Sequence, residues 1–150
     1  MPDKHAKPHG KDLRKGRVSL PGQVYHITTI TFDRRPVFSD LRSARLLINA
    51  LREAQACDEA TTLAFVVMPD HLHWLLQLEA DASLSAVVGA VKAVTAHGLG
   101  ERIWQSGFHD HALRQEEDLA KLARYIVANP LRAGLVLRVG DYPHWDAVWL

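Results

Sequence analysis

Alternating and periodic apolar positions along the chain predict a mixture of strands and helices. Residues 24–32 are dense in β-branched and aromatic side chains and predict a first strand. Residues 63–78 form two apolar runs on either side of Pro69 and Asp70, which suit the middle of a tight turn, so they predict two adjacent strands. A further strand is expected over residues 109–114.

Three other segments carry apolar residues at helical spacing. They are a helix from a cap at Ser39 or Asp40 to about Ala56, a helix from a cap within residues 81–83 to the glycines at 98 and 100, and a helix from the acidic turn 116–118 to Pro130. Serine and aspartate side chains accept hydrogen bonds from the first free N–H groups of a helix. Proline ends a helix because it has no N–H to donate.

The order strand, helix, strand, strand, helix, strand predicts an α+β fold. Ferredoxin-like domains have this βαββαβ order, in which a four-stranded antiparallel sheet carries both helices on one face, as RRM-type domains do. The third helix, which carries Tyr125, is an addition at the C-terminal end and can cover the open face of the sheet. We expect one domain over residues 21–150, ending in a short C-terminal tail.

The composition is that of a globular protein, with 47% apolar and 23% charged residues in a chain of 150. No run approaches the ~20 apolar residues of a membrane span. The charged start of the chain lacks the apolar core of a signal peptide. The single cysteine, Cys57, excludes an internal disulfide and fits a reducing cytoplasm.

Positive charge is concentrated at the N-terminus. Residues 1–17 contain six lysines and arginines and two aspartates, a net charge of +4, although the whole chain carries +1. Residues 1–20 are poor in apolar side chains, so we expect a basic, flexible arm. This arm can contact nucleic-acid phosphates, with Arg17 as a candidate residue. Alternatively, its sole role is to improve solubility.

The central strand pair contains the first candidate for chemistry. Because side chains alternate on a strand, His71 and His73 project from one face while Leu72 points to the other. Two imidazoles side by side on a sheet can hold a divalent metal ion and leave other positions open for substrate, but the same spacing suits half-exposed strand residues. A second pair, His109 and His111, is expected to be more exposed, so the first pair is the favoured metal site.

The third helix supplies a second candidate. Its apolar stripe is centred near Ala123 and Ile126, and Tyr125 lies roughly 130° from that centre at about 100° per residue. Asn129 lies four residues later on the same flank as Tyr125. A core tyrosine would lie in the apolar stripe, so the position of Tyr125 is compatible with a functional role. The motif Tyr-x-x-x-Asn alone is not specific for any function.

A metal pair, an off-core tyrosine and an amide form a workable nucleophilic site. A phenol has a pKa of about 10, so it needs a nearby cation or base to attack as phenolate. A divalent ion beside a phosphodiester can neutralise developing charge. The suggested reaction is transesterification at a nucleic-acid phosphodiester through a phosphotyrosine. Such an exchange needs no nucleoside triphosphate, and the chain has no Gly-x-x-x-x-Gly-Lys-Ser/Thr loop.

Three motifs resemble one family. They are Met-Pro-Asp-His-Leu-His at 68–73, the tryptophan- and histidine-containing segment 103–111, and Tyr-Ile-Val-Ala-Asn-Pro-Leu-Arg-Ala-Gly-Leu-Val at 125–136. In this order they resemble the single-tyrosine (HUH) transposases of the IS200 type, and above all the REP-associated tyrosine transposases. The resemblance covers about residues 20–145.

This resemblance implies residue roles and partners. His71 and His73 match the paired histidines that bind Mg²⁺ or Mn²⁺, Tyr125 matches the nucleophile, and Asn129 matches the polar residue that completes the metal site. Family members cut single-stranded DNA beside a hairpin, form a 5′-phosphotyrosine link with the cut strand and then rejoin DNA ends. The resemblance also implies a bacterial cytoplasmic protein, monomeric or homodimeric, which associates with the nucleoid through DNA and not with a membrane.

The chain departs from the family pattern at three places. It has Val127 where many relatives have a histidine, His109 where an aromatic residue is common, and residues 143–145 where a Pro-x-Ser-Ser pattern is frequent. These departures leave the choice of DNA target more open than the chemistry.

Basic residues outside the arm are further candidates for DNA contact. They are Lys92, Arg34 and Arg35, although Lys92 can equally be a solvated surface residue. Two other functions stay open. One is a hairpin DNA- or RNA-binding protein on the same fold that does not cut. The other is a metal-dependent phosphodiesterase that uses water, with Tyr125 in a structural role.

Overall fold

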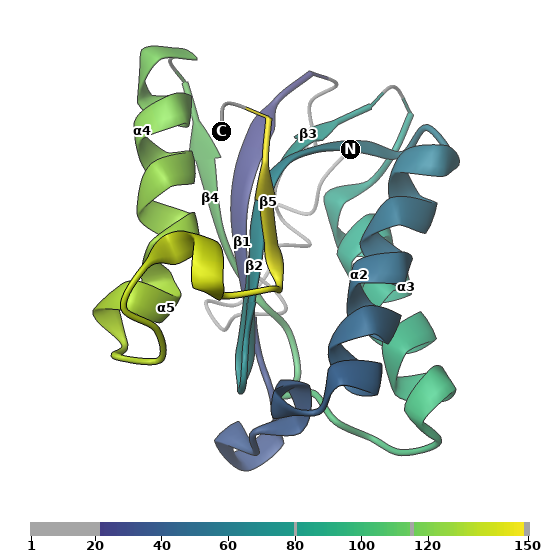
Figure 1. The fold of residues 1–150 in the computed structure, drawn as a ribbon. Coiled ribbons are helices and arrows are strands. Elements are labelled where there is room, and N and C mark those ends of the chain that lie inside the picture. Colours follow the sequence, from purple (N-terminus) through teal and green to yellow (C-terminus); the bar gives the residue numbers. More distant parts are fainter. Residues whose placement is uncertain (1–21, 80, 115, 149–150) are drawn as a thin grey trace.

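The computed structural model describes residues 22–79, 81–114 and 116–148 as a sheet with helices on both faces (Figure 1). The strands are β1 (Val24–Ile30), β2 (Ala60–Met68), β3 (His71–Leu78), β4 (His109–Leu113) and β5 (Trp145–Ala147). The helices are α2 (Leu41–Ala56), α3 (Leu84–Leu99), α4 (Glu116–Val127) and the short α5 (Asn129–Arg132).

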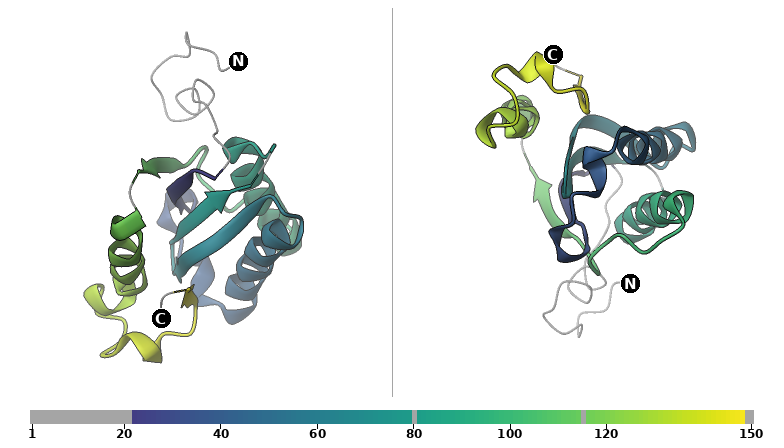
Figure 2. Two further views of the ribbon diagram at one scale, coloured as in Figure 1. Left: turned by 90° about the horizontal axis from the view of Figure 1, so that it is seen from above. Right: turned by 60° about the horizontal axis from the view of Figure 1, so that its bottom comes forward.

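The sheet has the order β4-β1-β3-β2-β5, with every pair antiparallel. Its first four strands have the ferredoxin-like order, which confirms the predicted α+β fold with an added helix. Figure 2 shows α2 and α3 on one side of the sheet and α4 with the C-terminal segment on the other.

The fifth strand lies in the segment that the sequence predicts as a short C-terminal tail. Trp145–Ala147 pairs with Val66–Ala64 at the free edge of β2. One further backbone bond, from the Val67 N–H to the His144 carbonyl, continues this pairing. A three-residue strand is too short to show alternation, so its pairing depends on the exposed edge of β2 and not on local pattern.

The two faces of the sheet carry separate cores. The core on the α2 and α3 side contains the largest buried side chains, including Trp74, Leu72 and Leu76. The second core joins the other face to α4, and its members are Ala64, Val66, Met68, Leu75, Ala123, Ile126, Val127 and Ala147. Helix α4 therefore covers part of the face that a four-stranded ferredoxin-like sheet would leave open.

Capping residues set the helix ends as the sequence predicts. The Asp40 carboxylate accepts a hydrogen bond from the Ser43 N–H at the start of α2, and the Ser83 hydroxyl accepts one from the Ala86 N–H at the start of α3. Gly100 follows α3 in the left-handed region with φ of 72°, where a residue without Cβ is favoured.

Truncating Ile126 should test how firmly α4 is held on the sheet. Ile126 is fully buried in the second core, so Ile126→Ala should lower the free energy of unfolding by about 2–5 kcal/mol. The matched control is Leu137→Ala, since Leu137 is 92% exposed and its loss should change stability by less than about 0.5 kcal/mol. Urea unfolding followed by tryptophan fluorescence measures both, and equal midpoints would contradict the described packing.

Residues 1–20 and Arg17 lie outside the described residues, so the expectation of a flexible arm is not tested. Within the described part of the chain, no helix has the length and apolar character needed to cross a membrane.

Candidate active site

Two histidines occupy the beginning of β3, on the face that α4 shares. His71 and His73 are half-buried there, while Leu72 and Trp74 lie in the core on the opposite face. The imidazole centres are 4.9 Å apart, with ring planes at 89°. The side-by-side arrangement that strand alternation predicts is therefore present, and a metal-binding role for it stays a prediction.

The first of these histidines is oriented by a carboxylate. Nδ1 of His71 lies 2.6 Å from Oδ1 of Asp70, and the other Asp70 oxygen accepts a hydrogen bond from Nε of Arg34 at 3.1 Å. Partial burial pushes the pKa of Asp70 up, but the hydrogen bond to His71 and the charges of His71 and Arg34 outweigh this effect and lower it. An ionised Asp70 favours the proton on Nδ1 of His71, which leaves Nε2 available to a metal.

The second histidine is oriented from strand β1. Nδ1 of His73 lies 3.1 Å from both Nε2 of His26 and Oγ1 of Thr28. Burial, together with the charges of His71, His26 and Arg132, lowers the pKa of His73 to about 3. His73 is therefore neutral near pH 7. With its single proton on Nδ1 it can donate to His26 or Thr28, and its Nε2 then carries the free lone pair.

His26 on β1 is thus a supporting residue for His73. Burial and the charge of His111 lower the pKa of His26. The alternative pair, His109 and His111, lies on the edge strand β4 and is exposed, which agrees with the expectation for it.

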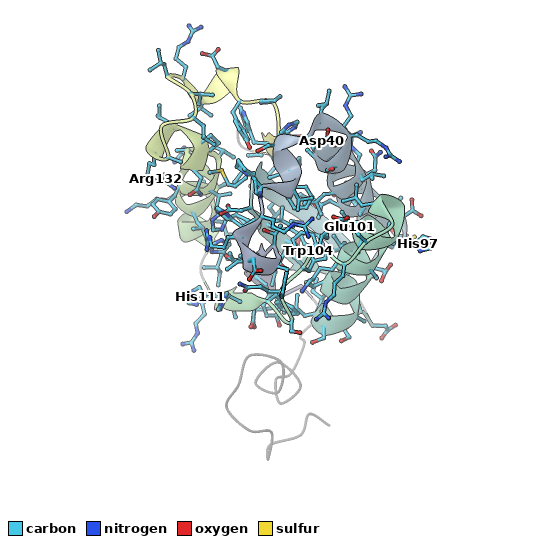
Figure 3. All side chains as sticks on the ribbon, turned by 90° about the horizontal axis from the view of Figure 1, so that it is seen from below. Asp40, His97, Glu101, Trp104, His111 and Arg132 are labelled. Atoms are coloured by element: carbon cyan, nitrogen blue, oxygen red, sulfur yellow. The ribbon has the colours of Figure 1, made fainter. Side chains whose placement is uncertain are left out.

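Tyr125 lies outside the buried stripe of α4, as predicted. Its side chain is 59% exposed, whereas Ala123 and Ile126 are fully buried. The guanidinium of Arg132 stacks on the Tyr125 ring, with Cζ 3.7 Å from the ring centre. Nη2 of Arg132 also donates a 2.6 Å hydrogen bond to the Tyr125 carbonyl. In Figure 3, Arg132 and His111 lie on one side of the molecule, away from His97 and Glu101.

Asn129 begins a second short helix. Helix α4 ends at Val127, and α5 follows with Pro130 in its first turn, so the proline breaks the helix without ending helical structure altogether. Nδ2 of Asn129 donates a 2.9 Å hydrogen bond to the Ile126 carbonyl. The amide oxygen of Asn129 is therefore the atom that this side chain can offer to a ligand.

Metal binding by the residues named from the sequence stays a prediction. Within the described residues, no group of three or more histidine, cysteine, aspartate or glutamate side chains could hold a metal ion. The set that the sequence predicts consists of the two imidazoles of His71 and His73 and the amide of Asn129. An amide oxygen suits Mg²⁺ or Mn²⁺, whereas imidazole nitrogen is more typical of transition-metal ions, and three protein donors leave positions open for a phosphate substrate.

The basic residues named from the sequence have partners within the fold. Arg34 contacts Asp70, Nη2 of Arg35 lies 2.6 Å from a Glu101 oxygen, and Nζ of Lys92 donates to the backbone carbonyls of Gln105 and Gly107. These contacts give each residue a structural role. Contact with DNA stays a prediction for all three, and Arg17 lies outside the described residues.

Changing Asp70 should weaken metal binding through His71. Because the carboxylate fixes the proton of His71, Asp70→Asn is expected to lower Mn²⁺ affinity by about 10- to 100-fold. Titration calorimetry of the DNA-free protein measures this. Asp141→Asn is the matched control, since Asp141 pairs with Arg138 at an exposed position. Equal Mn²⁺ affinities in the two variants would contradict the orienting role of Asp70.

Comparison with known proteins gives consistent matches. A family model described as IS200-like transposase matches residues 19–129. A REP-associated tyrosine transposase of Escherichia coli K12 is 37% identical over 82 residues, which are 53% of this chain and 50% of that protein. A Haemophilus influenzae protein assigned to the same group is 30% identical over 144 residues, covering 82% of this chain and 78% of the relative.

Solved structures agree with these matches. The structure of a REP-associated tyrosine transposase bound to a REP hairpin has a TM-score of 0.76 and 28% identity, and the match covers 86% of this chain and 79% of that one. A Deinococcus radiodurans protein has a TM-score of 0.54 and 24% identity over 74% of this chain and 93% of its own, a likeness that concerns the fold alone.

Proposed function

The chain belongs to the family of IS200-like transposases, and from this premise we propose that it is a metal-dependent single-stranded DNA endonuclease and strand transferase that acts beside hairpin DNA. One observation carries the proposal: the same face of the sheet holds the His71 and His73 pair and the helix with the exposed Tyr125. The matched family region includes all three residues.

In the proposed reaction, the hydroxyl oxygen of Tyr125 attacks the phosphorus of a DNA phosphodiester. The new Tyr–O–P bond replaces the bond between phosphorus and the 3′-oxygen, and the phenol proton passes to solvent. The 3′-oxygen leaves and takes up a proton. The products are a 5′-phosphotyrosine and a free 3′-hydroxyl, which can later reverse the exchange on another end. One ester bond replaces another, so no nucleoside triphosphate is consumed.

We assign the metal ligands to Nε2 of His71, Nε2 of His73 and the amide oxygen of Asn129. A bound Mg²⁺ or Mn²⁺ would neutralise the charge that develops on the phosphate and orient the diester. The protein residues do the rest: Asp70 holds His71, while His26 and Thr28 hold His73. Arg132 holds the ring of the nucleophile.

The proposed substrate is hairpin DNA of the REP type with adjoining single strand. The relative whose solved structure contains a REP hairpin supports this choice, since the match covers most of both chains. The E. coli relative is matched over half its length. A monomer and a homodimer both remain compatible with the proposal, and the mass of the protein in solution with and without a hairpin distinguishes them.

Incubation with a labelled hairpin oligonucleotide and Mn²⁺ tests the proposal. A protein–DNA adduct that survives denaturation is the expected result. Binding without an adduct or cleavage would instead favour a hairpin DNA- or RNA-binding protein. Cleavage without an adduct would favour a phosphodiesterase that uses water.

A further inference from the structure

We propose that Arg132 is a catalytic residue that binds the scissile phosphate directly beside the Tyr125 hydroxyl. The inference rests on the proposed function and adds a residue that the metal pair, Tyr125 and Asn129 do not include. It follows from the contacts, the exposure and the unused donors of the guanidinium.

The guanidinium of Arg132 is fixed in place by two contacts with the same residue. Its Cζ lies over the Tyr125 ring, 3.7 Å from the ring centre, and Nη2 donates to the Tyr125 carbonyl at 2.6 Å. A stacked and hydrogen-bonded guanidinium loses little further freedom when it binds a ligand. Any phosphate that approaches the Tyr125 hydroxyl therefore meets a pre-positioned cation.

The helix break explains why the carbonyls near Tyr125 have side-chain partners. In a continuous helix the N–H of residue 130 would donate to the Ile126 carbonyl, but Pro130 has no N–H. The Asn129 side chain donates to that carbonyl instead, and the Arg132 side chain donates to the Tyr125 carbonyl one residue earlier. The break therefore brings an arginine from α5 back over the tyrosine of α4.

Most of the donors of this guanidinium have no partner among the residues that the structure describes. An arginine has five N–H donors, and within the described residues Arg132 makes a hydrogen bond with one of them and no ion pair with a carboxylate. Its side chain is exposed. By contrast, Arg34, Arg35 and Arg138 each contact an aspartate or glutamate. Arg132 is thus a cation beside the proposed nucleophile for which the described part of the chain provides no anionic partner, and such a cation can bind a phosphate.

The two contacts with Tyr125 place the Arg132 guanidinium beside the atoms that react in the proposed step. A phosphodiester shares one negative charge between two non-bridging oxygens, and Arg132 would donate to one of them while the Tyr125 oxygen attacks phosphorus and the 3′-oxygen leaves.

The first test measures the rate of adduct formation at saturating hairpin oligonucleotide. Removing one donor that stabilises developing charge slows catalysis by about 100- to 1,000-fold, so Arg132→Ala should show a loss of that size. Millimolar guanidinium should restore part of the rate. Arg132→Lys should remain slow, because an ammonium cannot stack and donate in the same plane. Arg138→Ala should react like the wild type, since Arg138 is exposed and paired with Asp141.

A second substrate separates phosphate contact from a purely structural role. In a methylphosphonate at the scissile position, a methyl group replaces one charged oxygen. If Arg132 binds that oxygen, wild type and Arg132→Ala should form adducts with at least one methylphosphonate isomer at similar rates. An equal loss on the diester and on both isomers would mean that Arg132 only positions Tyr125, and would overturn the inference.

The outcomes also separate this inference from the proposed function. If wild type forms an adduct and Arg132→Ala forms it at the same rate, the inference is overturned and the proposed function stands. If wild type forms no adduct, the proposed function is overturned and the inference with it.

Discussion

Replacing Tyr125 with phenylalanine is expected to abolish the covalent protein–DNA adduct while leaving the fold intact. The substitution removes the only atom that can attack phosphorus at this position, and a phenyl ring can still stack under Arg132. Within the described residues the hydroxyl makes no hydrogen bond, and the side chain is 59% exposed. The free energy of unfolding should therefore change by less than about 0.5 kcal/mol. Denaturing electrophoresis of the labelled hairpin reaction measures the adduct.

The two other tyrosines make the result specific. Tyr25 is buried in the opposite core. The hydroxyl of Tyr142 donates to the Val67 carbonyl, and burial raises the pKa of Tyr142 to about 12, which disfavours its phenolate. Tyr142→Phe is thus a matched control that should lose about 1 kcal/mol of stability and keep the adduct. An adduct in Tyr125→Phe would assign the nucleophile to another residue and contradict the proposed chemistry.

Strand alternation was sufficient to predict how the histidine pair is presented. His71 and His73 share a face because their spacing is two, and Leu72 and Trp74 are buried on the other face because a sheet has only two sides. The off-stripe position of Tyr125 followed from helical spacing in the same way. Both predictions depend only on local geometry, which the sequence expresses directly.

Arg132 could not be found by these patterns. Its contact with Tyr125 depends on a helix break, on the N–H that Pro130 lacks and on a long side chain that turns back. None of these features produces a periodic pattern in the sequence. Arg34 shows the same limit. The sequence predicts that Arg34 can contact DNA, which stays a prediction, and it does not reveal that the guanidinium also donates to Asp70 in the fold. The short strand β5 likewise depends on an edge of the sheet that forms only in the folded chain.

Replacing either histidine of the pair with alanine is expected to remove metal-dependent cleavage and leave hairpin binding largely intact. Loss of one imidazole would leave the proposed cation with one side-chain nitrogen and one amide oxygen, so cleavage should fall by at least about 100-fold. DNA affinity should persist because phosphate contacts are spread over many basic groups. A cleavage assay with added Mn²⁺ and a separate binding titration measure the two effects.

The two variants should differ in stability, because the histidines have different partners. In His71→Ala, Asp70 keeps its contact with Arg34. In His73→Ala, His26 and Thr28 lose a half-buried partner, which should cost about 1 kcal/mol more. His97→Ala is the control, since His97 is exposed on α3 on the far side of the molecule (Figure 3). Unchanged metal-dependent cleavage in both variants would show that the histidine pair is not part of the site. If cleavage is lost but the two variants are equally stable, the metal site stands, and the support that strand β1 gives to His73 is contradicted.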